Sequence, residues 1–266
     1  MNMYRIMSFN IRTQTEYDKE QQFKYRADFL CDTLNALQPD VVGFQEMTPY
    51  MRGLMIERMP GYVFLGGGRE ADHLGEGCGI CVRQSRFLIE RVSTEMLSPT
   101  PAVAGSTYGG DQSECPRVFT SCDLMPIEGG QPFRVMNMHT DHIGIRARQL
   151  ESEQFLDAYY KKQELRPMPT VLTGDFNALP KADELKSLMD CPHFIDVSAD
   201  LGGTFHDYER LEKPEKIDYI LASREWRIER VRLPHEKRNG LFLSDHDPII
   251  ADLVLPGKEK ENSYAF

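Results

Sequence analysis

The sequence predicts an α/β protein in which two mixed β-sheets pack against each other and helices cover them. Short runs rich in apolar, β-branched and aromatic residues recur along the whole chain, and several alternate with polar residues, as half-buried strands do. Helical patterns lie between some of these runs. One pair of runs is joined as a hairpin, which favours mixed sheets over a purely parallel sheet.

The predicted elements follow in chain order. A hairpin at 123–135 has Gly129 and Gly130 at its turn, and segment 98–116, rich in Pro, Gly and Ser, is the predicted long loop. Helices are predicted at 25–37 and 145–161, where apolar residues recur along one side. Strands are predicted at residues 4–9, 40–46, 62–66, 79–83, 133–139, 169–175, 216–222, 226–233 and 248–255.

Length and composition indicate one soluble domain. The chain has 266 residues, and large sandwich enzymes run to ~250 residues as one unit. We find no internal repeat or domain boundary, so a single domain is expected at 1–256, with 257–266 as a solvated tail. No apolar run approaches the ~20 residues of a membrane helix, and the first residues lack the apolar region of a secretion signal, which favours a cytoplasmic protein.

Charge and cysteine usage disfavour some functions. The formal net charge of −10, without a dense Lys/Arg block, disfavours tight binding of long duplex DNA but not a small phosphorylated substrate. Cys78 and Cys81 form one CxxC without a second pair or a nearby histidine. We therefore expect reduced thiols packed as small hydrophobic residues rather than a zinc or redox site.

Acids, amides and histidines gather where predicted strands end. A single Asp or Asn there is an ordinary turn residue, but polar groups at so many strand ends exceed what turns require. A strand end holds its side chain on a rigid element at the rim of a sheet, so the group predicts a preorganised site. The residues are Asn10, Glu46, Asn137, His139, Asp175, Asn177, Asp218, Asp245 and His246.

This set of side chains fits a site for a hard cation and a phosphate. The carboxylates of Glu46, Asp175 and Asp245 suit Mg²⁺ or Mn²⁺. Asn10 and Asn177 offer N–H donors to phosphate oxygens, and the two histidines supply proton transfer near neutral pH. Because no Ser or Cys stands in a nucleophile motif, the expected attacking group is water.

The strand ends belong to short motifs, which are in chain order SFNIR, PDVVGFQE, NMH, TGDFNALP, IDYIL and SDHDP, between residues 8 and 248. In this order they resemble the endonuclease/exonuclease/phosphatase superfamily, which includes DNase I and exonuclease III. The resemblance implies a four-layer α/β sandwich with its site on one rim. Lys216, where exonuclease III-like enzymes carry Arg, and the lack of a WCDR-type motif disfavour two other branches of the family. The overall pattern, including GGGREADHLGEG and the pair Pro116 and Arg117, most resembles an uncharacterised bacterial subgroup.

The resemblance also implies roles for the matching residues. Glu46 is the implied principal metal ligand, with Asn10 beside it near metal and phosphate. Asp245 is implied to assist the metal or the histidine network. Asp175 is implied to orient or deprotonate the attacking water, and Asn177 to hold a phosphate oxygen.

The histidines and two further residues complete the expected site. His139 is implied to stabilise charge on the phosphoryl group, and His246 to pair with Asp218 as an acid/base or a second charge stabiliser. Glu76 matches a glutamate that orients the first histidine, so it is expected to pair with His139; a solvated acid in a Gly-rich turn is the alternative. Arg117 is either a phosphate-facing arginine or part of a rim salt bridge.

The stretch LSDHDPIIADLVL, at 243–255, sets His246 between two acids before an apolar run. Alternation along an extended chain would place Asp245 and Asp247 on one face and His246 on the other. The resemblance favours His246 turned toward Asp218. Asp247 falls where family members place varied residues, so it is expected to be a solvated or capping acid.

The expected function is hydrolysis of a phosphomonoester or phosphodiester by water, dependent on Mg²⁺ or Mn²⁺. The acidic charge favours a phosphorylated small molecule or a lipid headgroup as substrate, whereas the resemblance keeps a nuclease acting on DNA or RNA as the alternative. A catalytically silent binding module on the same fold is the alternative of another class. The sequence disfavours it because no residue of the expected site is lost.

Overall fold

Strands from distant parts of the chain form the first of two β-sheets. The computed structural model describes residues 2–256; Met1 and the predicted tail 257–266 lie outside the described residues. The strand order is β11 (Arg227–Arg232), β14 (Ile249–Leu255), β1 (Asn2–Asn10), β2 (Val41–Met47), β4 (Gly77–Arg83) and β3 (Tyr62–Leu65). Because β1 is parallel to β2 and antiparallel to β14, this sheet is mixed.

The second sheet comes from the middle of the chain and is also mixed. Its strand order is β5 (Phe87–Met96), β6 (Val118–Pro126), β7 (Phe133–His139), β8 (Thr170–Asp175), β10 (Asp218–Ser223) and β9 (Phe194–Asp196). Within it, β7 and β8 are parallel and the other pairs antiparallel. A separate small hairpin joins β12 (Lys237–Arg238) to β13 (Leu241–Phe242).

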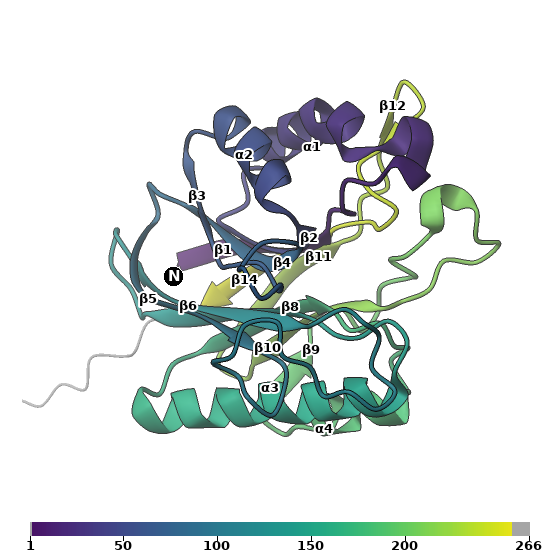
Figure 1. The fold of residues 1–266 in the computed structure, drawn as a ribbon. Coiled ribbons are helices and arrows are strands. Elements are labelled where there is room, and N and C mark those ends of the chain that lie inside the picture. The colour runs from purple at the N-terminus through teal and green to yellow at the C-terminus, as the bar shows by residue number, and fades with distance from the viewer. Residues whose placement is uncertain (1, 257–266) are drawn as a thin grey trace, which may run out of the picture.

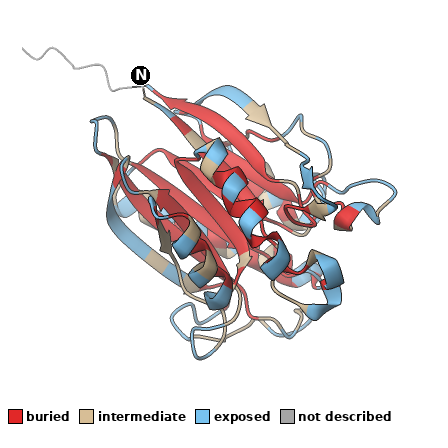
Figure 2. Cartoon of the chain, turned by 90° about the horizontal axis from the view of Figure 1, so that it is seen from above, coloured by how far each residue is buried: buried red, intermediate tan, exposed pale blue. Residues whose placement is uncertain are grey.

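Helices cover the outer face of each sheet, so the protein has four layers (Figure 1). Apolar residues of both sheets fill the space between them. Two further apolar cores lie between the sheets and their helices, one for each sheet. Figure 2 shows buried strands and helices whose outer sides are exposed. The helices are α1 (Phe23–Leu37) and α2 (Pro49–Arg58) on the first sheet, and α3 (Ile145–Leu165) and α4 (Lys186–Met189) on the second. The predicted sandwich is confirmed.

Some elements escaped the sequence prediction for a physical reason. Strand β5 is mostly exposed, and its apolar and polar residues do not alternate as they do in a half-buried strand. Helix α2 begins after Thr48, whose hydroxyl accepts a hydrogen bond from the Met51 N–H, a capping contact that was not anticipated. The predicted loop 98–116 indeed contains no helix or strand. Among residues 2–256, no helix is long and apolar enough to cross a membrane.

A buried polar network joins the two sheets beneath the rim. Asn137 of β7 donates to the carbonyl oxygens of Phe44 and Gly79 in the facing sheet, over 2.8 and 3.0 Å. Its Oδ1 accepts from Gln45 Nε2 at 2.6 Å and from Thr173 Oγ1 at 3.0 Å. Asn137 was grouped with the predicted site from its place at a strand end. The structure buries it fully between the sheets, where it fixes their relative position.

Gly43 of β2 lies against this network without room for a side chain. A Cβ atom there would lie 2.1 Å from Thr173 Oγ1 and 2.7 Å from Asn137 Oδ1. We therefore expect Gly43→Ala to lower the free energy of unfolding by about 1–3 kcal/mol, measured by urea denaturation.

A matched control is Gly53→Ala in helix α2, where the added Cβ would have no atom within 4 Å. Because alanine favours helix over glycine, this variant is expected to gain up to about 1 kcal/mol. A Gly43→Ala protein as stable as the parent would show that the sheets do not touch closely at this point.

Candidate active site

Three of the predicted site residues lie side by side on adjacent strands of the second sheet. The parallel register of β7 and β8 sets His139 opposite Asp175, and the antiparallel register of β8 and β10 sets Asp175 opposite Asp218. His139 Nε2 lies 3.5 Å from Asp175 Oδ2. Strand pairing alone therefore assembles this half of the site.

Glu46 is directed into the site by a bulge in β2. The pairing of β2 with β4 shifts register between Phe44 and Met47, and Glu46 there has a φ of 63°. A non-glycine residue in this left-handed region is strained by roughly 1–2 kcal/mol, and such strain is characteristic of functional positions. Burial raises the pKa of Glu46, but Arg12, the Thr13 N–H and Asn10 outweigh it and hold that pKa below its usual value.

Asn10 links the acids of the two sheets. Its Nδ2 donates to Glu46 Oε1 at 3.0 Å and to Asp175 Oδ2 at 2.9 Å, and its Oδ1 accepts from the Arg12 N–H at 3.0 Å. The side chain is fully buried behind the carboxylates. Its amide therefore positions Glu46 and Asp175 in the structure, and its expected place near metal and phosphate stays a prediction.

His246 and Asp218 form the expected pair. Nδ1 of His246 lies 2.8 Å from Asp218 Oδ2, and both side chains are buried. The Phe205 ring packs on the imidazole at 4.8 Å between centroids. Burial lowers the pKa of His246, but the Asp218 carboxylate and its hydrogen bond outweigh burial and raise that pKa to about 10. The ring is therefore an imidazolium at neutral pH.

Asp175 has the environment of a base poised near neutral pH. Burial and the adjacent Asp218 carboxylate raise the pKa of Asp175 to about 7. Its Oδ1 accepts from the Asn177 N–H at 2.9 Å, and His246 Nε2 lies 3.8 Å from its Oδ2. Asn177, with a φ of 47°, donates its amide to the Thr140 carbonyl at 3.0 Å.

Glu76 does not form the expected pair with His139. Its carboxylate instead forms an ion pair with Arg69 at 2.8 Å, and no hydrogen bond joins it to His139 among the described residues. Burial, and then Arg117 and Arg69, hold the pKa of His139 well below its usual value. His139 is therefore a neutral imidazole, because burial and the positive charges of the two arginines both disfavour its charged form.

Arg117 is buried and forms an ion pair with Asp141, which agrees with the salt-bridge alternative. One of its Nη atoms lies 2.8 Å from His142 Nδ1, and its Nε lies 3.6 Å from Asp141 Oδ2. The guanidinium lines the same cavity as the site acids. Arg117 and Arg69 thus give one wall of the cavity a positive charge.

Arg12 is a site residue that the sequence reasoning missed, although it closes the SFNIR motif. Its guanidinium lies 3.5 Å from Asp245 and 4.0 Å from Glu46, and it is held by Asp18 at 3.0 Å. With a φ of 52°, its backbone turns the chain away from β1 at the rim. The SFNIR motif includes Arg12, but nothing in the motif indicates a left-handed backbone conformation at this residue.

Asp245 and His246 face the same cavity, so the alternation expected along this stretch is wrong. The reason is that β14 begins only at Ile249, and the preceding residues are not in a strand. Asp247 points elsewhere and is neither solvated nor capping: both of its oxygens lie 2.9 Å from His235 Nδ1.

These side chains line one cavity of about 400 Å³ at the rim of both sheets. Asn10 and Asp218 lie behind its wall and support residues that reach it. The predicted residues on its surface are Glu46, Glu76, Arg117, His139, Asp175, Asn177, Asp245 and His246. Residues on its surface that the sequence reasoning missed include Arg12, Arg69, His142, Phe205 and Asp207.

The buried charges fit a hard divalent cation. Glu46 and Asp245 share one nearby guanidinium, that of Arg12, which is also engaged by Asp18. This surplus of buried carboxylate suits Mg²⁺ or Mn²⁺, and Glu46 and Asp245 are the residues that would hold it. Atoms of Asp175, Asp218 and His246 also lie within 4.8 Å of one another. The hydrogen bond from His246 to Asp218 favours a role in acid–base catalysis for Asp175, Asp218 and His246.

Comparisons with known proteins find a matching family and similar solved structures. Residues 7–246 match the family model described as the endonuclease/exonuclease/phosphatase family. An endonuclease/exonuclease/phosphatase structure from Bacteroides vulgatus is 29% identical, with a TM-score of 0.88, over 96% of this chain and 100% of that one.

Two further solved structures share the fold at lower identity. A mannosyl-6-phosphatase from Bacteroides thetaiotaomicron is 24% identical, with a TM-score of 0.86, over 94% of this chain and 99% of that one. TDP2 from D. rerio, complexed with a single-strand DNA product, is 20% identical, with a TM-score of 0.71, over 96% of this chain and 100% of that one.

Proposed function

Because the chain belongs to the endonuclease/exonuclease/phosphatase family, we propose that it is a phosphoester hydrolase that depends on Mg²⁺ or Mn²⁺ and attacks its substrate with water. One observation carries the proposal. A single cavity is faced by two carboxylates suited to a hard cation, Glu46 and Asp245, and by a base and two imidazoles, Asp175, His139 and His246. Residues from both sheets contribute, so the arrangement does not result from the local conformation of a single turn.

The charge of each protein group determines its role in the reaction. Asp175 orients the attacking water and takes its proton. The imidazolium of His246 stabilises the negative charge that develops on the phosphoryl oxygens and can protonate the leaving oxygen. Neutral His139, 3.5 Å from Asp175, donates a hydrogen bond to a phosphoryl oxygen. Glu46 and Asp245 would hold a divalent ion, which when bound would supply Lewis-acid stabilisation of the same charge.

The walls of the cavity favour a small phosphorylated molecule, such as a sugar phosphate or a lipid headgroup. The cavity is lined by the acids Glu76 and Asp207 as well as by Arg69 and Arg117, and the chain carries a net charge of −10. A long polyanion would be repelled by this balance at every phosphate beyond the one held in the site. The structural neighbours named for a phosphatase and for a DNA complex indicate that the fold accommodates both substrate classes.

A substrate panel tests the proposal. Phosphates of sugars, inositols and lipid headgroups are compared with single- and double-stranded DNA and RNA, each with Mg²⁺, Mn²⁺ or EDTA. We expect hydrolysis that EDTA abolishes, with at least about tenfold higher kcat/KM for a small phosphate than for any nucleic acid. Faster cleavage of DNA or RNA would overturn the proposed substrate class in favour of the nuclease. No hydrolysis of any substrate would overturn the enzyme itself in favour of a silent binding module.

A further inference from the structure

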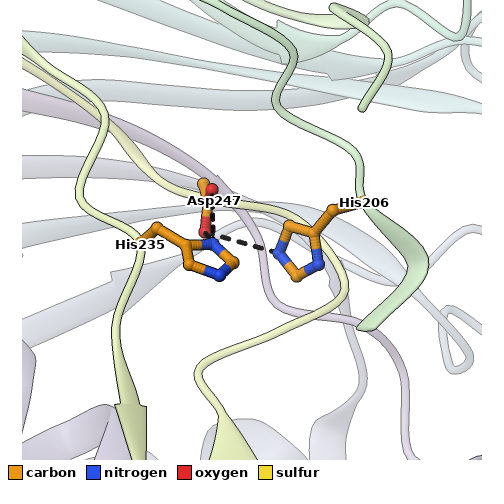
Figure 3. A group of neighbouring side chains, drawn as sticks. All are labelled: His206, His235 and Asp247. Carbon is orange, nitrogen blue, oxygen red and sulfur yellow. Dashed lines mark hydrogen bonds and ion pairs between the residues drawn. The ribbon is translucent and has the colours of Figure 1, made fainter. Parts of the chain in front are cut away.

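Two histidines and an aspartate meet just outside the catalytic cavity. His206, His235 and Asp247 each offer one ligand atom, and these atoms lie within 4.8 Å of one another. His235 Nδ1 lies 2.9 Å from both Asp247 oxygens, and His206 Nε2 lies 3.4 Å from Oδ1. Figure 3 shows both rings turned toward the carboxylate, from separate segments of the chain.

His206 is the unusual member of this cluster. The residue is 2% exposed, and its Nε2 has no hydrogen-bond partner among the described residues. A buried ring nitrogen without a partner is costly unless something else satisfies it. The nitrogen points to Asp247 without the geometry of a hydrogen bond, so the unsatisfied atom faces the centre of the cluster.

We propose that His206, His235 and Asp247 form a second cation site, of the kind that binds Zn²⁺. Two imidazole nitrogens and one carboxylate oxygen are a donor set that suits zinc, with a water completing four-coordination. The carboxylate-rich group at Glu46 and Asp245 suits Mg²⁺ or Mn²⁺ instead. The two sites thus differ in ligand chemistry and in the ion that they select.

The surroundings of His235 prepare it as a ligand. Its Nε2 lies 3.0 Å from Glu209 Oε1, and a carboxylate on this atom holds the ring proton there and leaves Nδ1 free for a metal. His206 must move its own proton. Its Nδ1 accepts a long 3.3 Å hydrogen bond from the Glu209 N–H. A metal at Nε2 would require the ring proton to lie on Nδ1 instead, which would break that bond.

A cation here would join three segments that surround the catalytic cavity. Segment 204–207 runs beside residues 245–247: Phe205 bridges His246, and the N–H groups of His206 and Asp207 both donate to the Asp245 carbonyl. His235 comes from the segment that follows β11. The ion would therefore fix Phe205 and Asp207 of the cavity wall from behind, without touching a substrate.

Metal binding to the whole protein tests the proposal. Co²⁺ serves as a spectroscopic probe for the zinc site and is titrated in the presence of saturating Mg²⁺, with Zn²⁺ uptake measured in parallel by equilibrium dialysis. We expect the parent protein to bind one more Zn²⁺ than His235→Ala and to give the visible absorption of four-coordinate Co²⁺. In His235→Ala the affinity should fall about a hundredfold or more, and the rise in Tm caused by Zn²⁺ should disappear.

Asp247→Asn is a second variant that removes a ligand while keeping its size, and exposed His193→Ala is the matched control that should bind like the parent. Equal Zn²⁺ uptake and equal Co²⁺ spectra in the parent, His235→Ala and Asp247→Asn would overturn the proposal, leaving a hydrogen-bonded cluster only. These readouts do not depend on hydrolysis, so the zinc site can fail or succeed independently of the proposed enzyme activity.

Discussion

Glu46→Gln is expected to lower kcat/KM for the best phosphoester substrate by about a thousandfold, on the scale of losing a principal electrostatic group of an active site. The substitution keeps the size of the side chain but removes the charge that a hard cation requires. Glu46 is held by the Thr13 N–H and by Asn10 in a left-handed bulge, which fixes the position of its carboxylate.

The measurement is kcat/KM as a function of Mg²⁺ concentration, with unfolding by heat as a check on the fold. The midpoint of the Mg²⁺ dependence should move to higher concentration in Glu46→Gln. Glu212→Gln, at an exposed position, is the matched control and should behave like the parent. A Glu46→Gln protein with the parent rate and the parent Mg²⁺ midpoint would sink the assignment of Glu46 as a metal ligand.

His246→Asn is expected to lower kcat by about 10²–10⁴-fold, the range typical of a lost acid–base group. The buried imidazolium, 3.8 Å from Asp175 Oδ2, supplies both a positive charge and a proton at the place where the phosphoryl group would react. The control is His73→Asn at an exposed position with a positive φ, which asparagine tolerates well.

Asp218→Asn tests the role of His246 through the pH dependence of kcat. With Asp218 present the pKa of His246 is raised to about 10, so the charged ring persists through neutral pH and is lost only as pH rises through about 10. Without the Asp218 carboxylate the largest raising influence is removed, while burial and the smaller influences of Asp245 and Asp175 remain, so the pKa of His246 falls. The alkaline limb of kcat should then move to lower pH, and an unmoved limb would show that the ring's charge does not limit the rate.

The sequence could predict which side chains lie at the rim, because strand ends are visible in its patterns. His139, Asp175 and Asp218 illustrate this: once the strands are placed, pairing in register brings them together. The pair of His246 with Asp218 was instead implied by the resemblance to the family, and the structure contains it at 2.8 Å.

The remaining features depend on how the two sheets stack and on local backbone conformations that no residue pattern encodes. Asn137 ends a strand as His139 does, yet it faces the opposite sheet. Glu46 and Arg12 reach the cavity through left-handed conformations that neither residue type favours. Glu76 pairs with Arg69, and Asp247 pairs with His235. Nothing in the sequence marked Arg69 or His235 as the partner of these acids.

The place of β14 in the first sheet has a consequence for biosynthesis. It lies between β11 and β1, and the residues just before it supply Asp245 and His246. During translation β1 therefore lacks its partner strand β14 on one side until most of the chain has left the ribosome. A nascent chain arrested before residue 245 would have the second sheet but no competent site, so catalysis would report that both sheets have closed.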